Sequence, residues 1–138
     1  MDDERGIDWW VKRLDALLES ALDAVVAGEG LTRRHWEVLH LLAEATVPES
    51  DVHTSLADVP GDTAAVLTDL AARGWVDRPR AGLLRLTADG VAVHDRILRA
   101  VTRVRRHTAD GLSRQEYERT VLVLTRMAEN VERALRRG

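Results

Sequence analysis

The chain has 138 residues, of which 45% are hydrophobic and 31% charged, and it contains no cysteine. This composition predicts one folded domain and excludes a disulfide framework, a cysteine-ligated zinc site and cysteine redox chemistry. The first ten residues are acidic, and no apolar run approaches the roughly 18 residues of a membrane span. The sequence therefore predicts a cytoplasmic protein without a signal peptide or a membrane partner.

Charge is divided unevenly along the chain. Residues 1–60 carry 5 basic and 13 acidic side chains, whereas residues 61–138 carry 15 basic and 10 acidic ones. A basic second half is compatible with an anionic partner such as nucleic acid. Ordinary surface patterning of Arg and Glu explains the same numbers equally well, so charge alone leaves both interpretations open.

The first half of the chain is predicted to be helical. Apolar residues at spacings of three and four predict a first helix over residues 7–27. Thr32 is expected to cap a second helix, and a short third helix follows Pro48. Asp62 is expected to cap a fourth helix that ends before Gly74, a residue type common just after helix ends.

Two short strands follow, "WVDR" at 75–78 and "LLRL" at 83–86, joined by the tight turn "PRAG". A one- or two-residue strand near Val47 is expected to complete a three-stranded sheet. A long helix then runs to about residue 107. The sequence "SRQE" at 113–116 is a capping box that predicts the start of the last helix.

Three stretches resemble the MarR family of winged-helix transcriptional regulators. "LTRRHWEVLHLLAEA" at 31–45 is similar to the second helix of that family. "LTDLAARGWVDR" at 67–78 resembles its passage from recognition helix to wing, and "LRLTADGVAVHDRI" at 84–97 resembles the second wing strand and the helix after it. The resemblance implies a mainly α fold with a small β-hairpin wing, in which long terminal helices flank a winged helix-turn-helix.

The resemblance also implies a single domain over residues 1–138 that forms a homodimer. Residues 7–27 and 108–138 would be the dimerisation helices, about 32–90 the winged helix-turn-helix lobe, and 87–107 a connecting helix. A homodimer agrees with the long apolar stripes at both ends, which exceed what a small lobe can cover. Packing of both helices within one chain is the alternative.

In such a protein the fourth helix and the wing bind double-stranded DNA. The residues expected to contact bases or phosphates are Thr63, Thr68, Arg73, Arg78, Arg80, Arg85, Arg33 and Arg34. Each arginine also has an ordinary surface interpretation, and Arg78 is equally placed to pair with Asp77.

Two positions depart from the family pattern. Ala65 and Asp69 stand where that family usually has basic residues, and a carboxylate near phosphates weakens binding. The wing also lacks the family's Asp-x-Arg motif. These departures leave open a degenerate winged-helix dimer that binds a protein partner or a ligand instead of DNA.

The resemblance further implies a small aromatic or anionic effector that modulates a repressor-type function. Side chains suited to a planar ligand are Trp9, Trp10, His35, Trp36 and His40. Trp10 and Trp36 fit core packing at least as well.

No enzyme, cofactor or metal site is predicted, because the five histidines form no HExxH motif and the chain has no P-loop, GxGxxG or GxSxG. The basic residues Arg96, Arg99, Arg103 and Arg106 are expected to pair with Asp8, Asp15 and Glu19 of the acidic first helix.

Overall fold

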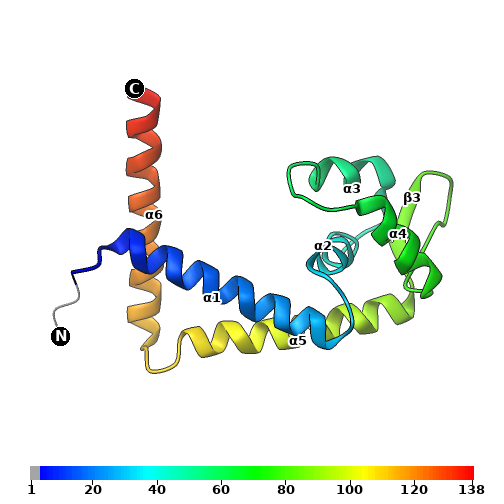
Figure 1. Cartoon of the computed structure of the whole chain (residues 1–138), viewed down its shortest axis with the longest axis horizontal. Coiled ribbons are helices and arrows are strands. Elements are labelled where there is room, and N and C mark those ends of the chain that lie inside the picture. Colours follow the sequence, from blue (N-terminus) through cyan, green and yellow to red (C-terminus); the bar gives the residue numbers. More distant parts are fainter. Residues whose placement is uncertain (1–3) are drawn as a thin grey trace. The chain divides into compact units, whose positions relative to one another are not determined.

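The computed structural model describes residues 4–138, which form two units with a boundary between Val104 and Arg105. In chain order the elements are α1 (Ile7–Gly28), α2 (Arg33–Leu41), β1 (Val47–Pro48), α3 (Glu49–Ser55), α4 (Thr63–Ala72), β2 (Val76–Asp77), β3 (Leu83–Leu86), α5 (Ala88–Thr108) and α6 (Arg114–Arg137) (Figure 1). This order confirms the predicted fold class, including the short first strand.

The helices of the winged lobe begin and end where the local sequence signals lie. The Thr32 side chain accepts a hydrogen bond from the backbone of His35 at the start of α2. The Asp62 carboxylate accepts the Ala65 N–H at 3.0 Å at the start of α4. Gly74 has a φ of +76°, the left-handed conformation that ends a helix at low cost for glycine.

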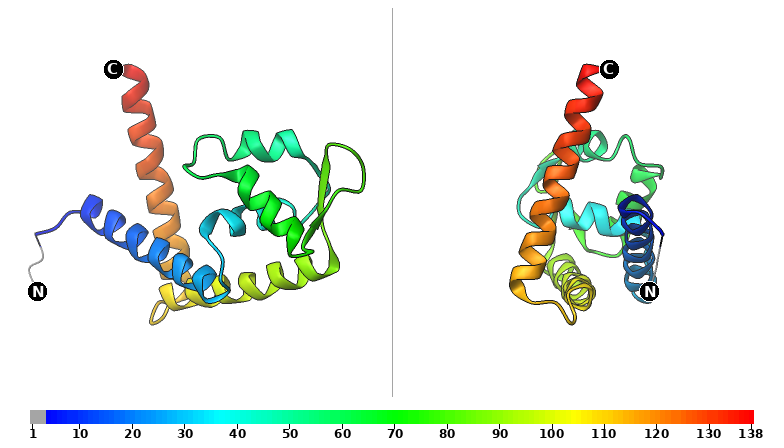
Figure 2. Two further views of the ribbon diagram at one scale, coloured as in Figure 1. Left: turned by 45° about the vertical axis from the view of Figure 1, so that its right-hand side comes forward. Right: turned by 90° about the vertical axis from the view of Figure 1, so that its left-hand side faces the viewer.

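The three strands form a small antiparallel sheet in the order β1-β3-β2. Val47 lies opposite Leu84, and Val76 lies opposite Leu86. The loop between β2 and β3 extends from this sheet as the wing (Figure 2). The Glu49 N–H donates to the Gly82 carbonyl at 2.8 Å, so the end of the wing loop is tied to the start of α3.

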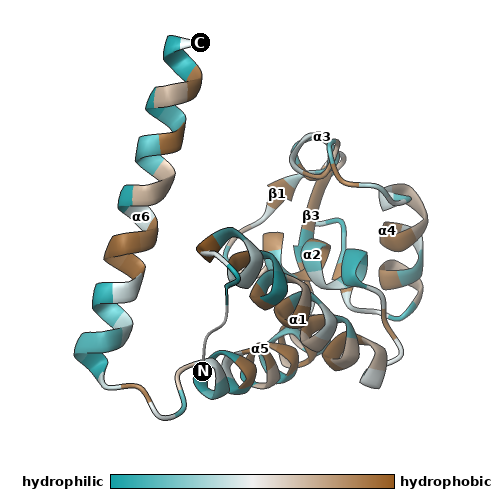
Figure 3. Ribbon diagram, turned by 60° about the vertical axis from the view of Figure 1, so that its left-hand side comes forward, coloured by the Kyte–Doolittle hydropathy of each residue, from teal (hydrophilic) through white to brown (hydrophobic). Residues whose placement is uncertain are grey.

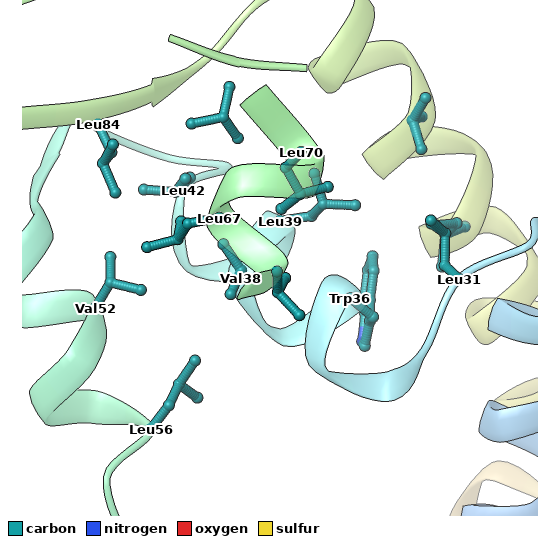
Figure 4. Close-up of a cluster of buried hydrophobic side chains, with 14 of the residues drawn as sticks. Leu31, Trp36, Val38, Leu39, Leu42, Val52, Leu56, Leu67, Leu70 and Leu84 are labelled. Carbon is teal, nitrogen blue, oxygen red and sulfur yellow. The ribbon is translucent and has the colours of Figure 1, made fainter. Parts of the chain in front are cut away.

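One hydrophobic core holds the lobe together (Figure 4). Leu39 of α2, Leu70 of α4, Leu84 of β3 and Ile97 of α5 are fully buried in it. Burying a leucine or isoleucine side chain stabilises a fold by about 1.5–3 kcal/mol. The inward face of α4 is formed by Val66, Leu67 and Leu70, which are its buried residues.

The first turn of α5 contacts the segment that leads from α4 into β2. The Thr87 hydroxyl donates to the Gly74 carbonyl at 2.6 Å and accepts the Gly90 N–H at 3.1 Å. A Cβ on Gly90 would lie 2.1 Å from the Trp75 carbonyl oxygen. A larger residue at position 90 would therefore push α5 away from the sheet.

The second unit contains α6, which starts with the predicted capping box between Ser113 and Glu116. None of its residues is buried. Its exposed apolar side chains are Tyr117, Val121, Leu122, Val123, Leu124, Met127, Val131 and Leu135. Brown hydrophobic segments accordingly alternate with teal polar ones along this helix in Figure 3.

Within the first unit, α1 is similarly uncovered over most of its length. Its exposed apolar side chains are Ile7, Trp9, Trp10, Val11, Leu14 and Leu17, whereas Val26 near its end joins the core. No helix among residues 4–138 is both long and apolar enough to cross a membrane.

Candidate nucleic-acid interface

The outward face of α4 is composed mainly of small side chains. Ala64, Ala65, Thr68, Ala71 and Ala72 are exposed on it. The Thr68 hydroxyl donates to the Ala64 carbonyl at 3.0 Å, which leaves its oxygen free to accept. This face offers methyl groups and one hydroxyl to a partner, so hydrogen bonding to base edges from α4 itself is sparse.

Asp69 is turned toward α2. Its Oδ2 lies 2.8 Å from His35 Nε2 and accepts a hydrogen bond from Arg73 Nε at 2.9 Å. The hydrogen bond from His35, followed by that from Arg73, holds the pKa of the Asp69 carboxyl below its usual value. The negative charge that raised doubt about DNA binding is thus paired with two donors of the lobe.

Arg73 carries a second contact besides this ion pair. Its guanidinium carbon lies 5.1 Å from the centre of the Trp75 ring, a cation–π distance. Arg73 therefore has two attractions within the lobe that a DNA phosphate would have to replace.

The wing arginines are also paired. Arg78 binds Glu49 of α3 through both guanidinium Nη atoms, at 2.6 and 3.2 Å. Arg85 binds Asp77 of the neighbouring strand at 2.8 and 3.3 Å. The alternative pairing of Arg78 with Asp77 is wrong, because Asp77 lies opposite Arg85 in the strand register. These carboxylates raise the pKa of both guanidinium groups, through hydrogen bonds first and charge second.

Arg80 at the tip of the wing differs from the other wing arginines. It is exposed, and no residue of the described chain pairs with its guanidinium. Its backbone carbonyl accepts the Leu83 N–H at 3.1 Å and closes the turn. Arg80 is thus a positive charge on a short, well-defined turn.

The two arginines at the start of α2 do not fit the expected role in phosphate binding. Arg33 pairs with Glu19 and with Asp23 of α1, and Glu19 is the largest cause of its raised pKa. The side chain of Arg34 is only 6% exposed, and its guanidinium donates to three backbone carbonyls. Arg34 is therefore directed into the lobe, where no phosphate reaches it.

The lobe as a whole is not basic. Residues 33–86 contain six arginines and eight carboxylates. Five of the six arginines have a carboxylate within 4.0 Å, and in the described chain only Arg80 does not. Positive charge is therefore concentrated at the wing tip.

Aromatic and histidine rings meet between α2 and α5. The Trp36 ring stacks on His40 and on His94, with centroids 4.9 and 5.1 Å apart. His40 Nδ1 lies 3.0 Å from His94 Nε2, and His94 Nδ1 lies 3.1 Å from the Asp95 carboxylate. The Asp95 carboxylate can only accept, so a neutral His94 that donates to it through Nδ1 has Nε2 left to accept a hydrogen bond from His40 Nδ1.

The five residues expected to line an effector site fall into three places. Trp36 and His40 belong to the cluster with His94, and Trp36 is buried. Trp9 and Trp10 contact each other edge to face on the exposed first turns of α1. His35 binds Asp69 through one ring nitrogen and the Thr32 backbone N–H through the other, at 3.2 Å.

The prediction that the basic stretch of α5 pairs with Asp8, Asp15 and Glu19 of the first helix is wrong for the ion pairs that the structure shows. Arg96 binds Glu29 at the end of α1 through two hydrogen bonds of 2.8 and 2.6 Å. Glu19 pairs with Arg33 instead. Glu29 lies just beyond the predicted first helix, so helical spacing along α1 did not select it.

Sequence reasoning missed three partners in the lobe, namely Glu49, Asp77 as the partner of Arg85, and His94 as the partner of His40. The chain separations are 29 residues for Arg78–Glu49 and 54 for His40–His94. Only the register of the two wing strands, which places Asp77 opposite Arg85, was accessible from the hairpin pattern.

No protein-family model and no curated protein matches the chain. Solved structures do match it over nearly their whole length. The MarR family protein Rv2887 of Mycobacterium tuberculosis has a TM-score of 0.71 at 21% identity and covers 91% of this chain and 96% of its own. MepR, which regulates the multidrug efflux pump MepA of Staphylococcus aureus, has a TM-score of 0.80 at 14% identity over 92% and 99%. NadR has a TM-score of 0.66 at 23% identity over 95% and 98%.

The chain therefore has the winged-helix fold of MarR family transcriptional regulators, and the predicted resemblance in fold is confirmed. Two of these proteins have been solved with DNA, namely Rv2887 and a mutant of MepR. Rv2887 has also been solved with p-aminosalicylic acid, and NadR with 4-hydroxyphenylacetate. These structural neighbours are transcription regulators and not enzymes.

Proposed function

We propose that this protein is a homodimeric transcriptional regulator of the cytoplasm that binds a palindromic operator through α4 and the wing. The observation that carries the proposal is a winged-helix lobe, matched over about nine tenths of the chain by regulators that include DNA complexes. Thr63, Thr68 and Arg73 of α4 and Arg78, Arg80 and Arg85 of the wing remain the residues proposed to contact DNA.

A dimer accounts for the uncovered apolar faces. The exposed apolar side chains of α1 and α6 exceed what a soluble monomer usually leaves in water. On α6 the residues Tyr117, Val121, Leu124, Ala128, Val131 and Leu135 recur at spacings of four and three, which places them on one stripe. A symmetric pair of chains would bury such stripes against each other.

The ion pairs of the lobe do not prevent DNA binding. An exposed ion pair contributes about 0–1 kcal/mol, and salt weakens it further. Arg78, Arg85 and Arg73 have side chains 50%, 52% and 37% exposed, so exchange of a carboxylate for a phosphate costs little. Arg80 needs no exchange, and a dimer presents two such residues.

We further propose that the protein acts as a repressor and that a small aromatic or anionic effector modulates its binding to DNA. Support comes from the ligands of Rv2887 and NadR, both aromatic carboxylates. In this chain, the exposed side of His40 beside the buried Trp36 is the ring surface that fits a planar ligand. No cofactor or metal is proposed.

The test is a salt series with purified protein and two fluorescent duplexes, one from the region upstream of its own gene and one random. A sequence-specific regulator should prefer the upstream duplex, and log affinity should fall linearly with log salt. Equal binding to both duplexes, or none at about 50 mM salt, would refute the proposal.

The rival function is a winged-helix dimer that binds a protein partner. One observation favours it: residues 33–86 carry more carboxylates than arginines, and the outward face of α4 is largely alanine. Such a protein would form the same dimer, yet it would not bind either duplex at low salt.

A further inference from the structure

The turn that precedes α4 is built around a single side chain of α2. Arg34 Nη1 donates to the carbonyl of Leu56 at 3.3 Å, and Nη2 donates to those of Val59 and Pro60 at 2.6 and 2.7 Å. These carbonyls extend from the residue that ends α3 to the residue before Gly61. One guanidinium therefore holds the whole connection between α3 and α4.

The next residue in the chain is adapted to this side chain. Gly61 has a φ of +151°, which L-amino acids with a side chain rarely adopt. A Cβ at this position would lie 2.7 and 2.8 Å from Nη2 and Nε of Arg34. The guanidinium thus fills the space that a side chain at position 61 would need. Asp62, which caps α4, comes immediately afterwards.

Stability alone does not account for a charged group at this position. Arg34 is 6% exposed, and its nearest carboxylate, that of Glu37, is 3.5 Å away. Arg34 Nε and Glu37 Oε2 are buried without a hydrogen-bond partner among the described residues. Burying a charge is costly, and an apolar side chain of similar size often serves stability as well or better. What an apolar side chain lacks is a set of directed donors that fixes the turn.

We propose that Arg34 is a positioning residue for DNA recognition: it sets the geometry of residues 56–61 and thereby the placement of the first turn of α4 against the base edges. The inference rests on the proposed function. Since α4 carries few polar groups on its outward face, specificity depends on how closely the helix fits the groove. Arg34 acts through the backbone and touches no DNA.

Arg33 provides a matched control next to it in sequence. Both residues are arginines of the first turn of α2, but Arg33 pairs at the surface with α1 and not with the turn before α4. The variants are Arg34→Met, Arg34→Lys and Arg33→Met. Each is compared with wild type for affinity to a selected operator and to a random duplex, at several salt concentrations and at a temperature where circular dichroism shows all to be folded.

A positioning role predicts that Arg34→Met loses about tenfold or more in operator affinity while random-duplex affinity changes less than about twofold. The salt slope should stay the same, because the Arg34 guanidinium neutralises no phosphate. Arg34→Lys should recover only part of the preference for the operator over the random duplex. Its single ammonium nitrogen keeps a donor near the turn but cannot reach all three carbonyls that the two guanidinium nitrogens reach. Arg33→Met should keep the wild-type preference.

Other outcomes would overturn the inference. If Arg34→Met weakens binding to both duplexes equally and flattens the salt slope by about 0.9 for each phosphate no longer neutralised, Arg34 is a phosphate ligand. If Arg34→Met keeps the wild-type preference for the operator, Arg34 contributes to folding alone and not to DNA recognition. If wild type itself selects no sequence, the proposed function fails, and the inference with it.

A second measurement covers the case in which Arg34→Met does not fold. Hydrogen exchange of the backbone amides of residues 59–65 should be faster in Arg34→Lys than in Arg33→Lys, while exchange in the core of α2 stays equal. Equal exchange at residues 59–65 would overturn the positioning role without reference to DNA.

Discussion

The winged lobe and α6 use similar apolar residues in opposite ways. The lobe buries most of its leucines and valines in one core, whereas α6 buries none of its residues within the chain. The lobe is therefore stable through contacts within one chain. The apolar stripe of α6 is stabilising only when another surface covers it, which is the physical argument for a second copy.

The largest expected effect lies in the core of the lobe. Leu70 is fully buried, and Leu70→Ala should lower the free energy of unfolding by about 2–5 kcal/mol. The matched change Leu122→Ala, at a side chain 51% exposed and off the apolar stripe of α6, should alter the free energy of unfolding by less than about 0.5 kcal/mol. Urea unfolding followed by circular dichroism measures both. Similar losses in both variants would contradict the contrast between the two regions.

The next effect concerns assembly. If the proposed dimer forms, Leu124→Asp places a charge on the α6 stripe and should convert that dimer to monomer at micromolar concentration, because a buried unpaired charge is costly. Leu122 is a similarly exposed leucine of the same helix that lies off the stripe. Leu122→Asp should leave the dimer intact. Sedimentation velocity distinguishes the two, and a wild-type monomer would refute the argument at once.

A smaller effect separates free from paired arginines of the wing. Arg80→Ala should flatten the salt dependence of DNA binding by about 2 for a dimer with two wings, at about 0.9 for each phosphate contact. Arg85→Ala should flatten it less, because Asp77 already neutralises that guanidinium. The measurement is the slope of log affinity against log salt. An equal change of slope in both variants would show that the ion pair with Asp77 does not reduce the contribution of Arg85 to DNA binding.

The smallest effect is the pH dependence of the α2–α4 contact. The pKa of Asp69 is lowered in the folded chain, chiefly by the hydrogen bond from His35, so its contribution to stability is present above the carboxyl's ordinary pKa, about 4. That contribution is lost as pH falls through the lowered value. Asp69→Asn should thus melt at a lower temperature than wild type near pH 7, and the difference should shrink toward pH 3. A difference that persists at pH 3 would show that packing, not charge, is responsible.

The elements were predictable because their signals are local. Each helix-end signal acts on a backbone group within a few residues and can therefore be recognised in the sequence. These signals are Thr32, Asp62, Gly74 and the Ser113–Glu116 capping box. Apolar spacings of three and four predicted the first helix, and the resemblance to the MarR family supplied the topology. The fold and the candidate DNA-binding elements therefore follow from the sequence.

The partners of the charged side chains did not follow from it. An arginine has the same local signature whether it is buried on backbone carbonyls like Arg34, paired at the surface like Arg33, or free like Arg80. Which of these holds depends on groups 10 to 26 residues away that only the packed chain brings within hydrogen-bond distance. The sequence by itself determined which elements form and which faces are apolar. The tertiary structure decided which charges remain available to a partner, because pairing depends on distance in space and not on separation along the chain.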